Sequence, residues 1–141
     1  MLVLDDPMLG LDAVVRSEFF GTIAEVLSSR ERAVLFTSHI LPDVERIADR
    51  IFILADGQVI AAGTLAELAR RVRRFNLRLP EKVTLPPGLP GLLSSRADGR
   101  GSIVVVTDDA PLRALQPEAM EESPMNLEEI FIALTGSRLS R

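Results

Sequence analysis

The sequence has 141 residues, of which 47% are hydrophobic, 26% charged and only 4% aromatic. This composition suits one compact domain or two small ones with an aliphatic core, and it argues against general disorder. The net charge of -4 gives no electrostatic case for nucleic acid as the main partner. Because there is no cysteine, disulfides, thiolate metal sites and cysteine nucleophiles are excluded. No apolar run approaches the roughly 20 residues of a membrane-spanning helix.

The chain begins with a pattern of alternating strands and helices. Residues 1–4 form an apolar run that is typical of a buried parallel strand. Since such a strand needs neighbours on both sides, we expect this one to come from a longer sheet. A helix is predicted from Asp12, which can cap it. Residues 33–37 predict a second strand, and residues 41–48 a short helix.

A β-hairpin is predicted over residues 50–62, because the dipeptide Asp56-Gly57 between two strand-like runs favours a tight type I′ turn. Residues 64–67 match a capping box and predict another helix. Strand, helix, strand, helix, hairpin and helix therefore follow one another over residues 1–74. This alternation indicates an α/β layer with a parallel core.

The character of the chain changes near residue 75, where prolines and glycines begin to interrupt regular structure. Beyond this point we expect one strong strand at 103–107 and a last helix over 126–134, capped by Asn126. Residues 75–141 thus predict a small α+β appendage. Four arginines near this boundary are interpreted as a solvated helix face: Arg70, Arg71, Arg73 and Arg74.

Candidate functional side chains follow the first two predicted strands. Asp5 and Asp6 come directly after the first strand, and His39, the only histidine, follows the second. In a sheet with adjacent parallel strands these groups meet at the C-terminal edge, where open α/β sheets bind ligands. One carboxylate could hold Mg²⁺, often through water, while the next orients or deprotonates an attacking water. The pattern favours metal-assisted hydrolysis of a phosphate.

The residues that carry this chemistry also resemble a known family. The segment from Leu2 to Asp12, LVLDDPMLGLD, resembles the Walker B segment and D-loop of ABC-transporter ATP-binding subunits. Residues 37–41 resemble the switch-histidine loop of that family, and residues 54–64 its terminal hairpin. Residues 127–136 resemble the end of the subunits that drive drug- and lipid-type exporters.

The resemblance implies a role for each matched residue. Asp5 would help to bind Mg²⁺, through water, beside the β- and γ-phosphates of ATP. Asp6 stands at the position of the general base, where the family normally has Glu. His39 would contact the γ-phosphate and the attacking water. Leu11 and Asp12 would lie at the interface of a nucleotide-binding-domain dimer.

The resemblance also implies an architecture and partners. The fold would be a partial P-loop NTPase (RecA-like) parallel sheet with a terminal hairpin over residues 1–74, the C-terminal half of a nucleotide-binding domain. The α+β accessory domain would follow over residues 75–141. Expected partners are a membrane-spanning permease subunit, a second nucleotide-binding domain and the missing N-terminal half, with ATP and Mg²⁺ bound by the complete domain. The expected location is cytoplasmic, peripheral on the inner face of the cell membrane.

Two departures from the family pattern leave alternatives open. Asp replaces Glu at position 6, and the sequence contains neither Gly-x-x-x-x-Gly-Lys-Ser/Thr, nor Leu-Ser-Gly-Gly-Gln, nor the glutamine loop. We therefore expect the isolated chain to bind no ATP appreciably. A second hypothesis is a non-catalytic remnant or split-gene module. A third is an independent metal-dependent phosphohydrolase that uses Asp5, Asp6, Asp12 and His39, and a soluble ABC protein of the translation or DNA-repair kind also stays open.

Overall fold

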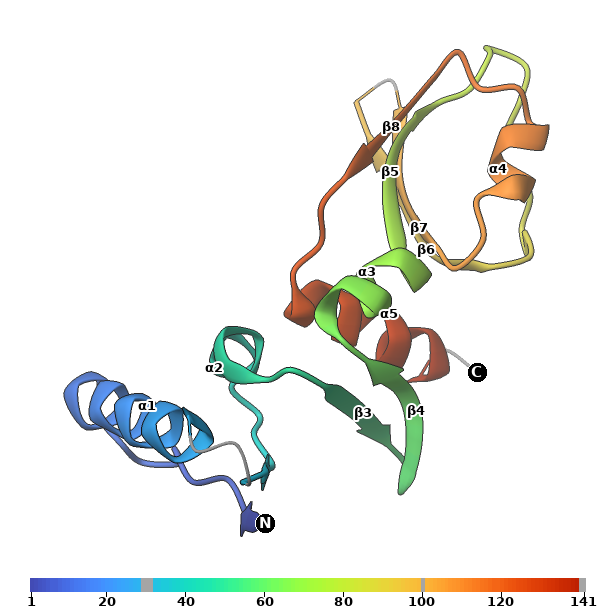
Figure 1. Ribbon diagram of the computed structural model, residues 1–141. Helices are drawn as coiled ribbons and strands as arrows, with labels where there is room; N and C mark the ends of the chain where they lie inside the picture. The colour runs from blue at the N-terminus through green and yellow to red at the C-terminus, as the bar shows by residue number, and fades with distance from the viewer. Residues whose placement is uncertain (29–31, 100, 140–141) are drawn as a thin grey trace. The chain divides into compact units, whose positions relative to one another are not determined.

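The computed structural model describes residues 1–28, 32–99 and 101–139 (Figure 1). The chain divides into two compact units, residues 1–47 and 48–141. Helices and strands mix throughout, so that the α/β class is confirmed. Within the described part of the chain, no helix combines the length and the apolar character needed to cross a lipid bilayer.

The first unit has the predicted order of strand, helix, strand and helix. Its elements are β1 (Leu2–Leu4), α1 (Ala13–Ser28), β2 (Val34–Phe36) and α2 (Leu41–Ile47). β1 and β2 pair in parallel, as predicted, and the pairing continues past the strands because the Thr37 N–H donates to the Leu4 carbonyl at 3.0 Å. Asp12 caps α1, since its Oδ1 accepts hydrogen bonds from the N–H groups of Val14 (2.9 Å) and Val15 (3.0 Å).

The expectation that β1 is buried is wrong for this chain. Leu2 is 41% exposed and Val3 is 61% exposed, and on β2 Leu35 is 49% exposed. The physical reason is that β1 has one neighbour, β2, in a two-stranded sheet. The buried apolar side chains of the unit lie elsewhere, on the loop after β1 and on α1: Met8, Phe20 and Ile23.

The second unit begins with the predicted hairpin. β3 (Ile51–Ala55) and β4 (Gln58–Gly63) pair antiparallel, and α3 (Leu65–Arg71) follows. The two turn residues, Asp56 and Gly57, have φ values of 51° and 73°, the left-handed pair that a type I′ turn requires. The predicted capping box is confirmed, because the Thr64 hydroxyl accepts from the Glu67 N–H at 3.1 Å and the Glu67 carboxylate accepts from the Thr64 N–H at 2.8 Å.

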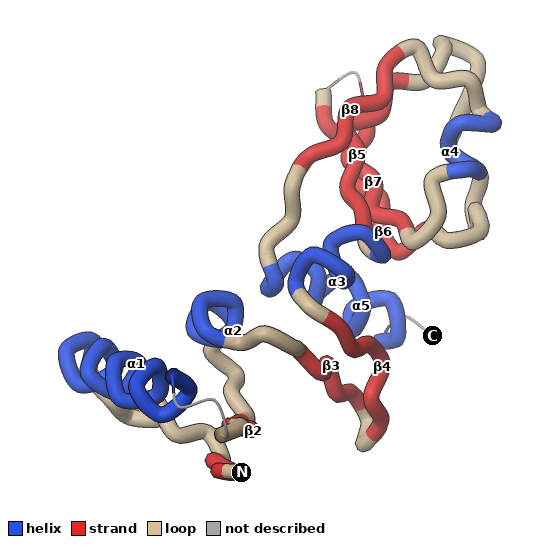
Figure 2. Tube along the Cα trace, in the orientation of Figure 1, coloured by secondary structure: helices blue, strands red, loops and turns tan. Residues whose placement is uncertain are grey.

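A four-stranded antiparallel sheet fills most of the rest of the second unit (Figure 2). Its order is β6-β7-β5-β8. The elements are β5 (Arg73–Arg78), β6 (Leu92–Asp98), β7 (Gly101–Val106), α4 (Ala110–Ala114), β8 (Ala119–Ser123) and α5 (Leu127–Leu139). Among these strands only β7 was predicted from the sequence. The predicted last helix is present with its Asn126 cap, whose Oδ1 accepts from the Glu129 N–H at 2.9 Å.

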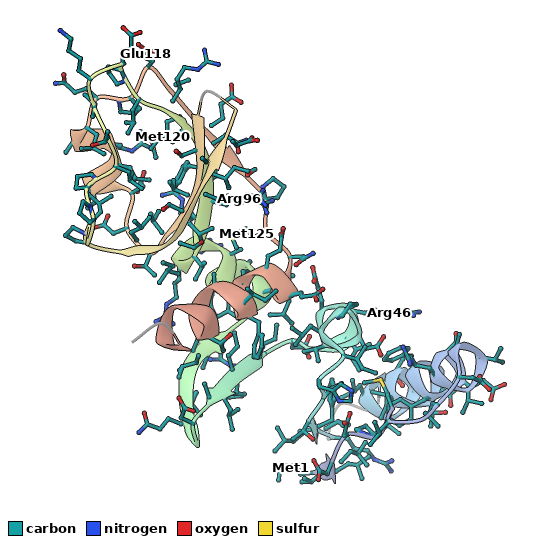
Figure 3. The ribbon with its side chains drawn as sticks, turned by 180° about the vertical axis from the view of Figure 1, so that it is seen from behind. Met1, Arg46, Arg96, Glu118, Met120 and Met125 are labelled. Atoms are coloured by element: carbon teal, nitrogen blue, oxygen red, sulfur yellow. The ribbon has the colours of Figure 1, made fainter. Side chains whose placement is uncertain are left out.

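The core of this sheet lies on the face toward α4, which closes a ring with the strands (Figure 1). Five buried apolar residues form it: Phe75, Leu77, Val104, Val106 and Leu112. Met120 packs against this cluster from β8, inside the ring (Figure 3). Alternate residues of β5 and β7 point into the core, as expected for strands with one buried face.

The two compact units do not separate where the sequence predicted a boundary. The second unit begins at residue 48, not 75. The reason is that α3 contacts both β4 and α5, and that β5 begins at Arg73, two residues after α3 ends. The hairpin and α3 therefore pack with the C-terminal residues. The division into the C-terminal half of a nucleotide-binding domain, residues 1–74, and an accessory domain, residues 75–141, stays a prediction.

The interpretation of four arginines as a solvated helix face is wrong for Arg73 and Arg74. Both lie on β5, and Arg73 makes a bidentate pair with Glu122 (3.1 and 2.7 Å). Its third nitrogen reaches Asp109 at 2.9 Å. Hydrogen bonding from Arg73 holds the pKa of Glu122 below its usual range, and Arg73, after Arg113, does the same for Asp109. The strand pairing brings these distant charges together.

Candidate functional site

The parallel pairing of β1 and β2 brings the predicted site residues together. Thr37, the first residue after β2, is the centre of the cluster. Its hydroxyl donates to Oδ1 of Asp5 at 2.5 Å, and its oxygen accepts from the Asp6 N–H at 2.9 Å. One hydroxyl thus connects both acidic residues at the end of β1 to the end of β2.

Asp6 and His39 are in direct contact. Nδ1 of His39 lies 2.7 Å from Oδ2 of Asp6, within the range of a charge-assisted hydrogen bond in which the ring donates. The Asp6 side chain is 25% exposed, whereas that of His39 is 64% exposed. The carboxylate can therefore hold the ring from the protein side while the remainder of the imidazole faces outward.

The backbone of Asp6 has an uncommon conformation. Its φ of 41° lies in the left-handed region, which few residues other than glycine adopt. This conformation turns the chain out of β1, and the Asp6 carbonyl accepts from the Leu9 N–H at 3.1 Å in the turn that follows. Uncommon backbone conformations of this kind cluster at functional sites.

The second carboxylate oxygen of Asp6 is buried and has no hydrogen-bond partner among the described residues. A buried acceptor without a partner costs about 1–3 kcal/mol. This oxygen therefore keeps unused capacity to accept a hydrogen bond. The other oxygen, Oδ2, is already bonded to His39.

The donor set fits a Mg²⁺ ion that arrives with other ligands, and it does not form a self-contained metal site. Asp5 is exposed at the strand end and can supply one oxygen. Within the described ranges, no three His, Asp or Glu side chains are placed to hold a metal ion. Mg²⁺ commonly uses one or two carboxylates together with water and phosphate. The four-residue metal cluster of the phosphohydrolase hypothesis is not formed, because Asp12 caps α1 instead.

Leu11 and Asp12 lie on the loop between β1 and α1. The Leu11 N–H donates to the Met8 carbonyl at 3.2 Å, and the Leu11 carbonyl accepts from Nη2 of Arg16 at 3.4 Å. Gly10 turns the loop with a φ of 78°. The role of Leu11 and Asp12 at a dimer interface stays a prediction.

Thr37 belongs to a predicted motif, but its contacts in the site were not predicted. A hydroxyl on the last residue of the second predicted strand was the available signal, because a residue there lies beside the end of the first strand. Arg16 and Asp43 were also missed. Their pairing between α1 and α2 has no signal in the local pattern.

Curated proteins similar to this chain match nearly all of it. ABC transporter ATP-binding protein YtrB of Bacillus subtilis is 30% identical over 145 residues, which cover 98% of this chain and 49% of YtrB. The uncharacterized ABC transporter ATP-binding protein sll0415 of Synechocystis is 44% identical over 138 residues, 94% of this chain and 39% of that protein. Nod factor export ATP-binding protein I of Burkholderia lata is 29% identical over 147 residues, 99% of this chain and 48% of that protein.

These relatives are all longer than this chain, which spans about half of their length or less. No protein-family model matches the sequence.

Proposed function

We propose that this chain is the C-terminal part of an ATP-hydrolysing subunit that powers transport across a membrane. The proposal builds on its similarity to ABC transporter ATP-binding proteins. One observation carries the proposal. Asp5, Thr37, Asp6 and His39 form one hydrogen-bonded cluster at the ends of two parallel strands, in which the backbone N–H of Asp6 supplies the link to Thr37. The motifs that carry the family resemblance supply these residues from two segments of the sequence.

The cluster divides the work of phosphate hydrolysis among its members. Asp5 would hold Mg²⁺ through water, and the ion would supply positive charge beside the β- and γ-phosphates. Asp6 would accept a proton from the attacking water as the general base. His39, fixed by Oδ2 of Asp6, would direct its exposed ring edge to the γ-phosphate.

The grip on the nucleotide would come from residues outside this sequence. The sequence has no Gly-x-x-x-x-Gly-Lys-Ser/Thr loop, whose backbone N–H groups and lysine cradle phosphates in P-loop proteins. The proposed source is the N-terminal half of the same domain. Exposed apolar side chains on the short strands support this, because Val3 and Leu35 are 61% and 49% exposed and suit burial by further strands.

The proposed assembly has further partners. A second nucleotide-binding domain would contact Leu11 and Asp12 across a dimer interface. ATP hydrolysis would drive conformational change in a membrane-spanning permease subunit. In that assembly the chain would lie on the cytoplasmic face of the membrane, as a peripheral subunit. Residues 1–74 would complete the catalytic domain, and residues 75–141 would form the accessory domain.

Two measurements test the proposal. First, titration calorimetry of the isolated chain with Mg·ATP should give no heat of binding, and a micromolar Kd would contradict the expected need for a second segment. Second, co-expression with a family segment that carries the Gly-x-x-x-x-Gly-Lys-Ser/Thr loop should give Mg²⁺-dependent ATP hydrolysis. Asp6→Ala should abolish this activity. Asp98→Ala, which removes an exposed carboxylate on β6, is the matched control and should leave it unchanged.

The second candidate function is a non-catalytic binding or regulatory module. The lack of the phosphate loop in the sequence is the observation that favours it. In that case the co-expressed segments would associate, but Asp6→Ala and the parent would hydrolyse ATP at the same background rate.

A further inference from the structure

α1 and α2 of the first unit are connected by a partly buried ion pair. Nη1 of Arg16, on α1, lies 3.5 Å from Oδ2 of Asp43, on α2. The Arg16 side chain is 31% exposed and that of Asp43 only 13%. Of the charged residues that the structure describes, Asp43 is the only buried one. A charge is rarely placed there without a specific partner.

The same guanidinium also binds the backbone of the loop after β1. Nη2 of Arg16 donates to the Leu11 carbonyl at 3.4 Å. Arg16 therefore contacts two segments at once, and each of them extends to the candidate site. Leu11 follows Asp6 in the loop, and Asp43 follows His39 at the start of α2.

Short hydrogen-bonded turns connect these contacts to the site. On one side, the Leu9 N–H donates to the Asp6 carbonyl at 3.1 Å. On the other side, the Ile40 N–H donates to Oγ of Ser38 at 3.0 Å and the Ile40 carbonyl accepts from the Asp43 N–H at 3.1 Å. Neither path leaves a long flexible stretch between Arg16 and the two residues of the Asp6–His39 pair.

The pair is poorly suited to a purely stabilising role. Nε of Arg16 and Oδ2 of Asp43 are buried, and neither has a hydrogen-bond partner within the described residues. A buried ion pair with incomplete hydrogen bonding commonly contributes no more than well-packed apolar residues of the same size. What an apolar pair could not supply is the directional bond from the guanidinium to the Leu11 carbonyl.

We infer that Arg16 is a positioning residue, which fixes the loop after Asp6 relative to the segment that carries His39. This positioning involves residues of this chain alone. Any effect of Arg16 on ATP hydrolysis rests on the proposed function. Arg16 would thus keep Oδ2 of Asp6 and Nδ1 of His39 at hydrogen-bonding distance.

The test uses the 141-residue chain and the variant Arg16→Lys. Lysine keeps a positive charge opposite Asp43, but its single ammonium cannot reproduce the planar fork that reaches two acceptors. Because His39 is the only histidine, its imidazole protons give unique NMR signals. We expect Arg16→Lys to shift these signals and to raise the hydrogen-exchange rate of the Leu11 amide about tenfold.

Arg46→Lys is the matched control. Arg46 also connects α2 to α1, because its guanidinium lies 4.9 Å from the centre of the Phe20 ring. In the described structure it makes no hydrogen bond or ion pair with Leu11 or Asp43, which are the partners of Arg16. This variant should leave both readouts unchanged. Equal changes in the two variants would show a general loosening of the helices and would overturn the inference, as would unchanged His39 signals in Arg16→Lys.

A second variant covers the case in which Arg16→Lys fails to fold. The double change Arg16→Met with Asp43→Leu removes both charges and keeps the volume. A folded double variant with shifted His39 signals supports the inference, and one with parent-like signals overturns it. Both readouts work without nucleotide. An assembly that never hydrolyses ATP would therefore contradict the proposed function while leaving this inference standing.

Discussion

Oδ2 of Asp6 lies 2.7 Å from Nδ1 of His39, so that the acid at the end of β1 already holds the only imidazole of the chain. The family has Glu where this sequence has Asp6. The aspartate side chain is one methylene shorter, which withdraws the carboxylate by on the order of 1 Å, and a displacement of that size can cost about 10²-fold in rate. Asp6 can therefore keep its contact with His39 and still support only slow ATP hydrolysis.

Asp6→Glu should accelerate ATP hydrolysis by the co-expressed assembly, by up to about 10²-fold, because the longer side chain carries the carboxylate closer to the attacking water. The measurement is the steady-state rate at saturating Mg·ATP. Asp5→Glu is the control and should give no acceleration, since the proposed role of Asp5 is to hold Mg²⁺ and not to activate the attacking water. If Asp6→Glu hydrolyses no faster than the parent, the shorter side chain is not what limits the rate.

Thr37→Val should destabilise the chain by about 0.5–1.5 kcal/mol, the usual contribution of a hydrogen bond. Valine keeps the shape but removes the hydroxyl that binds Asp5 at 2.5 Å and accepts from the Asp6 N–H at 2.9 Å. Urea unfolding measures the loss. Thr107→Val removes only a long hydrogen bond of 3.4 Å to the Gly91 carbonyl and should change stability less. Equal losses would mean that the Thr37 hydroxyl has no special role.

Arg73→Gln should make stability less dependent on pH in the acidic range. The pKa of Glu122 is held below its ordinary value of 4.5 by the Arg73 hydrogen bond, and the pKa of Asp109 lies below 3.8, mainly through Arg113 and then Arg73. Carboxylates with lowered pKa values stabilise the fold above the unfolded pKa, and this contribution is lost as the pH falls through the folded pKa.

We therefore expect the parent to exceed Arg73→Gln by about 1 kcal/mol at neutral pH, a modest figure because Glu122 is half exposed. The difference should shrink below about pH 4.5, where Glu122 begins to protonate in the unfolded chain. Urea unfolding at pH 7 and pH 3 measures it. Arg71→Gln, at an exposed position on α3, should show no such pH dependence. A constant difference at both pH values would rule out the ion pairs as its source.

Alanine substitutions at two glycines should change the stability of the chain in opposite directions. A Cβ at Gly101 would lie 2.8 Å from the Leu77 carbonyl on the neighbouring strand, so Gly101→Ala should destabilise by about 1–3 kcal/mol. A Cβ at Gly21 meets open space within α1, so Gly21→Ala should stabilise by about 0.5–1 kcal/mol. Urea midpoints measure both. A neutral Gly101→Ala would show that β5 and β7 can move apart at this point.

The features that could be predicted from the sequence depend on local chemistry. The turn at Asp56-Gly57 needs two left-handed residues, and the caps at Asp12, Thr64 and Asn126 need an oxygen near free N–H groups. The juxtaposition of Asp6 and His39 also followed from local reasoning, because parallel neighbours end at the same edge of a sheet.

The features that could not be predicted depend on partners far apart in the sequence. Arg73 reads as a solvated charge until β8 brings Glu122 beside it, 49 positions later. β6 carries mostly exposed, small or charged residues and has no apolar alternation to reveal it. Arg16 and Asp43 occupy positions that look like ordinary polar helix residues until α1 and α2 come together.

Val72 ends α3 and immediately precedes β5, and it is only 2% exposed. A polypeptide cut at the junction of residues 74 and 75 would therefore break a continuous packed segment. Because β5 runs from Arg73 to Arg78, the cut would divide this strand, leaving Arg73 and Arg74 on one piece and Phe75 on the other. The boundary between the two compact units, between Ile47 and Ala48, leaves β5 intact.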